Sequence, residues 1–311
     1  MAEQEKYLYG PVPSRRLGLS LGVDIVPFKV CTLDCVYCQL GRTAKKTIER
    51  KDYVPIEQIL AELRDKLAEG LNADFITISG SGEPTLHCKL GELIDGIKKI
   101  TDIPVAILTN STLLYRPDVR ADCSKADLVI PSLDAADKQT FQKINRPHKD
   151  INVEKVISGL CALRNQFTGQ IWLEVFVVEG FNTDAEQIAK IKDAVERIHP
   201  DKIQLNTAVR PTAEAGIKKP SAEKLKDIAN QLGQKCEVVA DFSPPHHSKH
   251  IENKAENLLS MLKRRPCSLN DICSSLGITH NEALKYINHL QNQSFIVSEQ
   301  QDGITFFKAL S

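Results

Sequence analysis

The chain has no surplus of charge and few aromatic residues. Its 40 Lys and Arg residues balance 40 Asp and Glu residues, and Trp, Tyr and Phe together make up 5% of the sequence. A balanced charge excludes the generally basic surface by which many nucleic-acid-binding proteins attract phosphate groups. Any contact with nucleic acid must therefore come from a local patch.

Long apolar runs are also missing. No stretch is apolar for long enough to span a bilayer, and Met1 to Lys6 lack the apolar core of a secretory signal peptide. We therefore expect no membrane partner and a cytoplasmic location, where thiols stay reduced. An apolar content of 42% over 311 residues still allows a large globular core.

The nine cysteines include one closely spaced set and no second one. Cys31, Cys35 and Cys38 follow a CxxxCxxC pattern, and no fourth cysteine lies near them. A complete iron–sulfur cubane takes four thiolates. Three thiolates would leave one iron free to bind a substrate or cofactor, much as an open position distinguishes a catalytic zinc from a structural one.

Two other interpretations of these cysteines stay open on spacing alone. The three thiols could lie on one face of a helix, where cysteine is often a small buried hydrophobe. Val30, Val36 and the nearby Pro27 disfavour a helix. The thiols could instead hold zinc, but zinc prefers four ligands, and the nearest histidine is the distant His87. A loop that carries a metal cluster is the interpretation we favour.

Strands and helices are predicted to alternate after this segment. Short apolar runs bounded by Gly, Pro or Asn predict strands, and apolar residues at helical spacing predict helices. The expected strands are Leu19–Val26, Phe75–Ser79, Val105–Leu108, Leu128–Ile130, Trp172–Val178, Lys202–Leu205 and Glu237–Ala240. The expected helices are Ile56–Leu67, Leu90–Ile100, Val153–Arg164, Ala185–Ile198 and Ala222–Leu232. Such alternation predicts an α/β protein whose parallel sheet carries its chemistry at the carboxyl ends of the strands.

The last part of the chain is predicted to form a second, small domain. Pro244-Pro245 indicates a linker over 244–253, so we expect domains at 1–243 and 254–311. Helices at 255–263, 269–276 and 281–293, the second capped by Ser268 and Gly277 and the third by Thr279, precede strands at 295–298 and 304–308 around Asp302-Gly303. This is the order of a winged helix-turn-helix.

The charge of this second domain is close to neutral. From Lys254 to Ser311 there are six Lys and Arg residues and five Asp and Glu residues. DNA-binding domains usually have a clear basic face, so a protein contact is as open as a nucleic-acid contact. The linker histidines, His246, His247 and His250, predict a surface turn, because no Cys, Asp or Glu lies at ligand spacing beside them.

A second motif follows the expected strand Phe75–Ser79. It reads Ser79-Gly80-Ser81-Gly82-Glu83-Pro84-Thr85. Two glycines let a backbone approach a ligand closely, and Glu83 can hold an ammonium by a charge-assisted hydrogen bond. An ordinary strand-to-helix turn is the alternative, but the nearby cysteine set favours a cofactor site.

Together the two motifs resemble the radical S-adenosylmethionine superfamily. The CxxxCxxC spacing, with Tyr37 before the last cysteine, is similar to that superfamily's signature, and Gly80 to Pro84 resembles its GGEP motif with Ser81 interrupting the glycine pair. Over residues 15–240 the resemblance implies a (β/α)6 partial TIM-type barrel. It also implies a 4Fe–4S cluster on Cys31, Cys35 and Cys38, whose unique iron is chelated by S-adenosylmethionine.

The resemblance further implies an activity and a set of cofactor-binding residues. A reductant such as flavodoxin or ferredoxin would drive cleavage of S-adenosylmethionine to methionine and a 5′-deoxyadenosyl radical, which abstracts hydrogen from a substrate. The expected cofactor-binding residues are Tyr37, Gly80, Ser81, Gly82, Glu83, Pro84, Thr109, Asn110, Ser132, Asp134, Glu174 and Asn206. Glu83 would meet the methionine amino group, Ser132 and Asp134 the carboxylate or ribose, and Asn206 the adenine or ribose. Each polar residue could instead form a turn or a cap, and an inward Glu174 would need a partner.

A narrower resemblance comes from Gly10–Gly18 and from Gln39-Leu40-Gly41-Arg42. These segments are similar to wyosine-synthase-like iron–sulfur oxidoreductases. Arg15, Arg16 and Arg42 would anchor a phosphate-bearing substrate or the cofactor carboxylate, or would be plain surface charge. Wyosine synthases that resemble this group carry a second cluster, and this chain has no second cysteine triplet. This disfavours wyosine synthesis itself. The expected substrate is transfer RNA or another RNA, and the alternatives are a peptide- or protein-modifying enzyme and a redox-sensing regulator.

Overall fold

The computed structural model describes residues 7–240, 254–278 and 280–310. Its main sheet has eight strands, in the order β1 (Leu8–Ser14), β2 (Gly18–Val23), β5 (Phe75–Ile78), β6 (Val105–Thr109), β7 (Leu128–Pro131), β8 (Gln170–Val177), β9 (Lys202–Thr207) and β10 (Cys236–Val238). Neighbours from β2 to β10 are parallel, and β1 pairs antiparallel with β2. The predicted α/β class with a mostly parallel sheet is confirmed.

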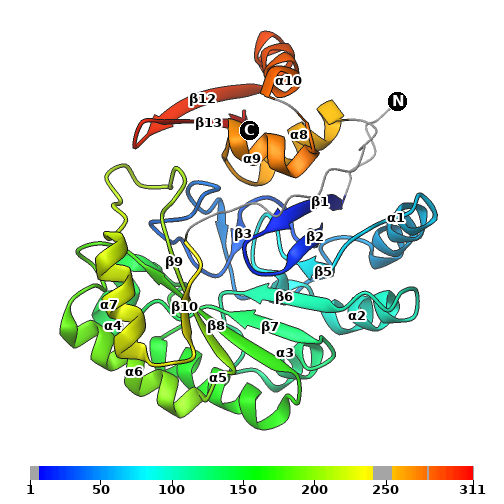
Figure 1. Cartoon of the computed structure of the whole chain (residues 1–311). Coiled ribbons are helices and arrows are strands. Elements are labelled where there is room, and N and C mark those ends of the chain that lie inside the picture. The colour runs from blue at the N-terminus through cyan, green and yellow to red at the C-terminus, as the bar shows by residue number, and fades with distance from the viewer. Residues whose placement is uncertain (1–6, 241–253, 279, 311) are drawn as a thin grey trace.

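Helices connect the parallel strands and lie along the outside of the sheet (Figure 1). They are α1 (Ile56–Ala68), α2 (Leu90–Lys98), α3 (Pro117–Cys123), α4 (Lys138–Ile144), α5 (Val153–Gln166), α6 (Ala185–Ile198) and α7 (Ala222–Leu232). Helices α3 and α4 and the 3-10 turn η1 (Pro84–Leu86) were not predicted, because segments this short carry too little periodicity to predict a helix.

Three differences from the expected sheet have physical reasons. Strand β1 was not predicted, because Pro11 and Pro13 lie within it and proline is confined to edge strands, where this one lies. The strand expected to run to Val26 ends at Val23, where the chain turns. The seven expected strands correspond to the parallel strands β2 and β5 to β10, so the sheet has one parallel strand more than the six of a (β/α)6 repeat, because β10 pairs with β9.

The two faces of the sheet bury different residues. Along β8, Leu173, Val175 and Val177 point into the large core under the helices. Strand alternation places Trp172, Glu174 and Phe176 on the opposite face, and Trp172 there packs in a small apolar cluster with residues of β6 and β7. We call this opposite side the inner face. The main core, under the helices, lies on the other face of the sheet.

The C-terminal elements have a core of their own. They are α8 (Lys254–Arg264), β11 (Cys267–Ser268), α9 (Leu269–Leu276), α10 (His280–Asn292), β12 (Ile296–Gln301) and β13 (Ile304–Ala309). The strands form an antiparallel sheet in the order β11-β13-β12. Leu258, Ile272, Ile287 and Phe307 lie in a separate core cluster. The helices and the hairpin follow the predicted order, and β11 was not predicted.

This C-terminal unit packs beside β1, with α8 and α9 in contact with that strand (Figure 1). The expected helix ends at Ser268 and Gly277 are confirmed, by a capping box and a left-handed C-cap respectively. The expected linker 244–253 with its three histidines, and the cap Thr279, lie outside the described residues. Among the helices that the structure describes, none has the length and apolarity needed to cross a membrane.

Candidate functional site

The cysteine segment is a loop at the carboxyl end of the main sheet. Cys31 ends the short strand β3 (Val30–Cys31), which pairs with β4 (Lys45–Lys46). Cys35 and Cys38 lie in the turn that follows, where the Cys38 N–H donates to the Cys35 carbonyl at 3.1 Å. The helical interpretation of the spacing is therefore wrong.

Each of the three thiols lies within reach of a side-chain nitrogen. The Lys29 ammonium lies 3.2 Å from Cys38 Sγ. The side-chain amides of Asn110 and Asn145 lie 3.4 Å from Cys31 Sγ and 3.4 Å from Cys35 Sγ respectively. Donors of this kind stabilise the negative charge of thiolates and tune a bound iron–sulfur cluster.

The donor set suits a cluster better than a single ion. Among the described residues, no group of three or more His, Cys, Asp or Glu side chains is placed to hold one metal ion. All three donors are cysteine sulfurs, which are the usual ligands of iron–sulfur clusters. Burial raises the pKa of the Cys31 thiol to about 12, so binding of iron would be what removes its proton.

The glycine loop (residues 79–84) follows β5 and lies against the cysteine segment. The Lys29 N–H donates to the Ser81 carbonyl at 2.8 Å, and the Glu83 N–H donates to the Val30 carbonyl at 3.1 Å. A Cβ on Gly82 would lie 2.0 Å from the Val30 carbonyl oxygen. A Cβ on Gly80 would likewise collide with a neighbouring carboxylate. These glycines therefore let the loop pack closely against other residues of the protein, and not against a ligand.

Glu83 is buried and already has several donors. Its Oε1 accepts hydrogen bonds from the Thr85 N–H at 3.1 Å and from the Thr85 and Thr109 hydroxyls at 2.6 Å each. Its Oε2 accepts the Asn110 N–H at 2.8 Å. Burial raises the pKa of Glu83, while these hydrogen bonds oppose the shift. Oε1 accepts three hydrogen bonds and Oε2 only one, so Oε2 is the oxygen that retains acceptor capacity for a cofactor ammonium.

Thr109 and Asn110 lie at the end of β6, as predicted; Thr109 contacts the glycine loop, and Asn110 contacts both the glycine loop and the cysteine segment. Besides meeting Cys31, the Asn110 amide donates to the Thr32 hydroxyl at 2.8 Å, and its carbonyl oxygen accepts from Thr112. Together with the Thr109 bond to Glu83, these contacts join β6 to both the cysteine segment and the glycine loop. The polar groups of Thr109 and Asn110 thus form hydrogen bonds within the protein.

Tyr37 and Asp134 meet on the other side of the cysteine segment. The Tyr37 hydroxyl donates to Asp134, and its ring stacks on Phe176 with 3.8 Å between the ring centres. Asp134 also accepts from the Asn145 amide at 2.6 Å and from the Phe176 N–H at 3.0 Å. Burial raises the pKa of Asp134 to about 6. These contacts fix the position of Asn145, the donor to Cys35.

Glu174 and Asn206 form a second group, on the inner face of the sheet. Glu174 forms an ion pair with Arg16, and the Asn206 amide donates to it at 3.3 Å. This supplies the partner that an inward carboxylate needs. Ser132 lies beside it, in a bridge with Glu174.

The other two predicted anchoring arginines have structural partners. Arg15 donates to the carbonyls of Val239 and Ala240, both at 3.2 Å. Since β1 and β10 are the two end strands of the main sheet, this contact connects its two ends. Arg42 is mostly exposed and forms ion pairs with Asp34 and Glu214 beside the cysteine segment.

Sequence reasoning missed several residues that build the site. Lys29, Asn145 and Asp24 each touch a cysteine or the glycine loop. Asp24 carried one usable signal, because it directly follows β2 at the carboxyl end of a parallel strand. Asn145 carried none, since its role depends on a contact with a segment 110 residues away, and Lys29 carried none, since the fold of the turn decides where its side chain points.

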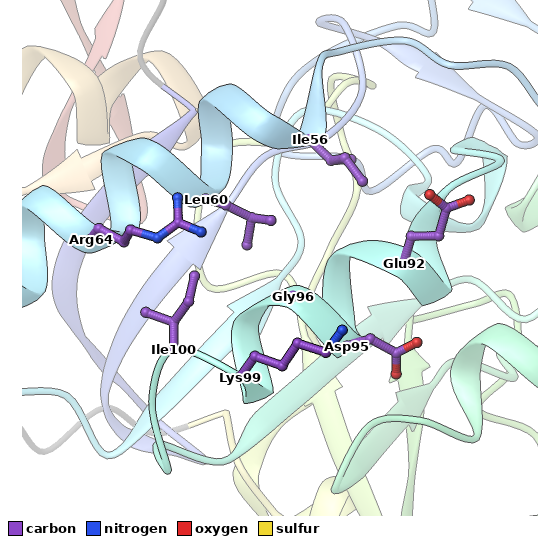
Figure 2. Close-up of a pocket in the computed structure, with 8 residues that line it drawn as sticks. All are labelled: Ile56, Leu60, Arg64, Glu92, Asp95, Gly96, Lys99 and Ile100. Carbon is purple, nitrogen blue, oxygen red and sulfur yellow. The ribbon is translucent and has the colours of Figure 1, made fainter.

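The structure has a small cavity beside this site and a larger groove away from it. A small internal cavity of about 10 Å³ lies behind the cysteine segment, with room for about one water molecule. The predicted residues that line it are Tyr37, Asn110, Ser132 and Asp134. A larger groove of about 660 Å³ lies between α1 and α2, lined by Leu60 and Arg64 on one side and by Lys99 and Ile100 on the other (Figure 2). No predicted site residue lines that groove.

Comparisons with known proteins agree with this geometry. Residues 25–192 match the Radical SAM superfamily. A UPF0026 protein of Methanocaldococcus jannaschii is 34% identical over 306 residues, which cover 96% of this chain and 94% of that protein. A Brachyspira hyodysenteriae protein named GTPase Obg is 37% identical over 305 residues, but this chain spans only 44% of its length.

The fold also matches solved structures. Streptococcus suis SuiB, crystallised with S-adenosylmethionine, aligns with a TM-score of 0.53 and 17% identity, over 71% of this chain and 50% of that one. At this identity the likeness shows the fold. The sequence matches place the chain among the UPF0026 proteins of the radical SAM superfamily, as a radical SAM enzyme whose cofactors are a 4Fe–4S cluster and S-adenosylmethionine.

Proposed function

We propose that this enzyme abstracts a hydrogen atom from a substrate held against the inner face of its main sheet. When bound, the reduced cluster and S-adenosylmethionine supply the 5′-deoxyadenosyl radical that accepts this hydrogen. One observation carries the proposal. Three thiols, each with its own nitrogen donor, meet the glycine loop at the carboxyl ends of the strands.

Some residues around the cluster would bind it and its cofactor, and others would position the binding residues. Cys31, Cys35 and Cys38 hold three irons, and their nitrogen donors balance the charge on sulfur. The glycine loop supplies backbone groups and one free acceptor position on Glu83 for the cofactor ammonium. Tyr37 and Asp134 keep the cysteine segment rigid, so that the cofactor is held in one orientation.

We assign the remaining predicted residues to the cofactor's nucleoside and to the substrate. Ser132 and Asn206 end neighbouring strands on the inner face and offer hydrogen bonds to a ribose or adenine. The Arg16–Glu174 pair beside Asn206 forms a polar wall there. The Arg15 contact across the two ends of the sheet supports a partial TIM-type barrel around this space.

We propose RNA as the substrate class, on the strength of the C-terminal unit. Its element order is that of a winged helix-turn-helix. Its helix α10 exposes Lys285, Asn288, His289 and Asn292, which can bond to bases or phosphates. The resemblance of Gly10–Gly18 and Gln39–Arg42 to wyosine-synthase-like oxidoreductases supports this class, although this chain has no second cysteine triplet. A peptide substrate is the alternative, because the unit's charge is nearly balanced.

We also propose the domain limits, the cytoplasmic location and the reducing partner that the sequence predicts. The separate C-terminal core supports domains at 1–243 and 254–311 joined by 244–253. Radical SAM enzymes need an external reductant, and we propose a flavodoxin or ferredoxin in the cytoplasm.

The test supplies candidate substrates to the reconstituted enzyme under dithionite. Bulk transfer RNA from a strain that lacks the gene should raise 5′-deoxyadenosine formation and yield a nucleoside of changed mass. A peptide digest of the same cells is the parallel arm. If peptides stimulate the reaction and RNA does not, RNA is the wrong class. If wild-type protein with a full cluster forms no 5′-deoxyadenosine at all, a redox-sensing role becomes the better explanation.

A further inference from the structure

We propose that the C-terminal unit sets the position of the cofactor-binding glycine loop through one side chain, Arg264. The proposal rests on the function proposed above, because it concerns the same loop. Arg264 lies at the end of α8, and it reaches across to the main sheet. In this role it is a positioning residue, which acts on the cofactor through other side chains.

Arg264 is fixed in place and largely buried. Its guanidinium lies over the ring of Tyr9, 4.2 Å from the ring centre, and donates to the carbonyl and hydroxyl of Ser260 at 2.9 and 2.7 Å. Its Nε lies 3.6 Å from Asp24 Oδ2, and the two side chains are only 12% and 10% exposed. The guanidinium thus touches both Tyr9 and Asp24.

Tyr9 and Asp24 in turn hold the first half of the glycine loop. The Tyr9 hydroxyl lies 3.0 Å from Ser79 Oγ. Asp24 accepts the Ser81 N–H at 3.1 Å and the Ser81 hydroxyl at 2.5 Å. Gly80 is pressed so closely on Asp24 that a Cβ would lie 2.4 Å from its carboxyl carbon. Any movement of Asp24 must therefore move residues 79–81.

The opposite side of the loop is fixed to the cysteine segment. The Ser81 carbonyl accepts the Lys29 N–H, and the Glu83 N–H donates to the Val30 carbonyl, one residue before Cys31. The glycine loop is therefore clamped between the cluster-binding segment on one side and the Tyr9–Asp24–Arg264 group on the other. The second side of this clamp includes the C-terminal unit.

The charges explain why Arg264 matters. Among the described residues, Arg264 is the only cation within ion-pair distance of Asp24. Burial raises the pKa of Asp24, and its bonds to Ser81 and the Arg264 charge work against that shift. Without Arg264, a buried carboxylate would have no cation beside it, which is strongly unfavourable. Asp24 would then protonate or move toward water, and the loop would lose a well-placed acceptor.

The experiment measures S-adenosylmethionine affinity of the full-length reconstituted enzyme, by dialysis and by the change in the cluster's EPR spectrum. Arg264→Gln should weaken binding on the order of tenfold, the usual scale of coupling between two sites. The matched control is Arg265→Gln, which removes the same charge one residue later, where no ion pair is present among the described residues. It should change affinity by less than about twofold.

A double variant distinguishes loss of the Arg264–Asp24 charge pair from a general loss of folding. In an Asp24→Asn background the carboxylate charge is gone, so adding Arg264→Gln should change affinity by less than about twofold. Equal affinity in Arg264→Gln and Arg265→Gln overturns the inference, as does a further tenfold loss in the Asp24→Asn background. Failure of the wild-type cluster-loaded protein to bind S-adenosylmethionine is a different result, and it would contradict the proposed function.

Discussion

The buried ion pair between Arg210 and Asp271 gives a sharp test of how the C-terminal unit is attached. Arg210 follows β9, and its NH2 group lies 3.2 Å from Asp271 Oδ1 in α9, with side chains 5% and 10% exposed. The two partners are not equivalent. Asp271 Oδ2 also accepts the Ser268 N–H at 3.0 Å, whereas Arg210 Nε is buried and has no hydrogen-bond partner among the described residues.

In the wild-type protein, Arg210 donates to Asp271 Oδ1 and the Ser268 N–H donates to Oδ2. In Asp271→Asn, only one side-chain oxygen is left for these two donors. Either the Arg210 guanidinium or the Ser268 N–H must then stay buried and unpaired, so we expect the free energy of unfolding to fall by about 3 kcal/mol. Arg210→Met leaves Asp271 its bond to Ser268 and should cost less. The double variant should be more stable than Asp271→Asn alone, because it removes the unpaired guanidinium.

Urea denaturation of the full chain, followed by circular dichroism, measures these differences. The exposed pair Lys51–Glu49 provides the control, and Lys51→Met should change stability by less than about 0.5 kcal/mol. The reasoning is refuted if Asp271→Asn is as stable as wild type, or if the double variant is less stable than both single variants.

Three other predictions concern the site. Lys29→Met removes the ammonium beside Cys38, so the cluster's midpoint potential should fall by tens of mV in an EPR titration; Lys45→Met is the control, and an unchanged potential contradicts this role. Because burial raises the pKa of Asp134 to about 6, its stabilising contribution is full below about pH 4 and is lost as the pH rises through about 6. Asp134→Asn should therefore gain stability relative to wild type between about pH 4 and pH 7 in urea denaturation, and a constant difference would show that Asp134 does not titrate there. Gly82→Ala should lower the iron content of the reconstituted protein, since its Cβ would collide with the Val30 carbonyl, whereas Gly96→Ala meets only the flexible end of a leucine and should bind iron normally.

The sequence predicts those parts of the fold that depend on local patterns. The buried strands follow apolar runs, and the long helices follow spacing and capping, as at Ser268 and Gly277. It fails at β1, where two prolines disguise an edge strand, and at α3 and α4, which are too short to show a period. These errors arise because pairing with a neighbour, and not local preference, decides the structure there.

The candidate site divides in the same way. Motif spacing identifies the cysteines and the glycine loop, and strand ends identify Thr109 and Asp134. The contacts that hold these residues could not be predicted, because Asn145 is 110 residues from Cys35 and Arg264 comes from another unit altogether. The sequence also suggests that Gly80 and Gly82 make room for a ligand, whereas the space beside them is occupied by Asp24 and Val30.

The most direct test of the central claim is the formation of 5′-deoxyadenosine. Wild-type protein, reconstituted anaerobically with iron and sulfide, should form it from S-adenosylmethionine and dithionite. Cys35→Ala should form none, because one of the three cluster ligands is lost. Cys161→Ala, which removes a thiol on α5 outside the cysteine segment, should match wild type. Equal product from Cys35→Ala and wild type would contradict the assignment of this loop as the cluster site.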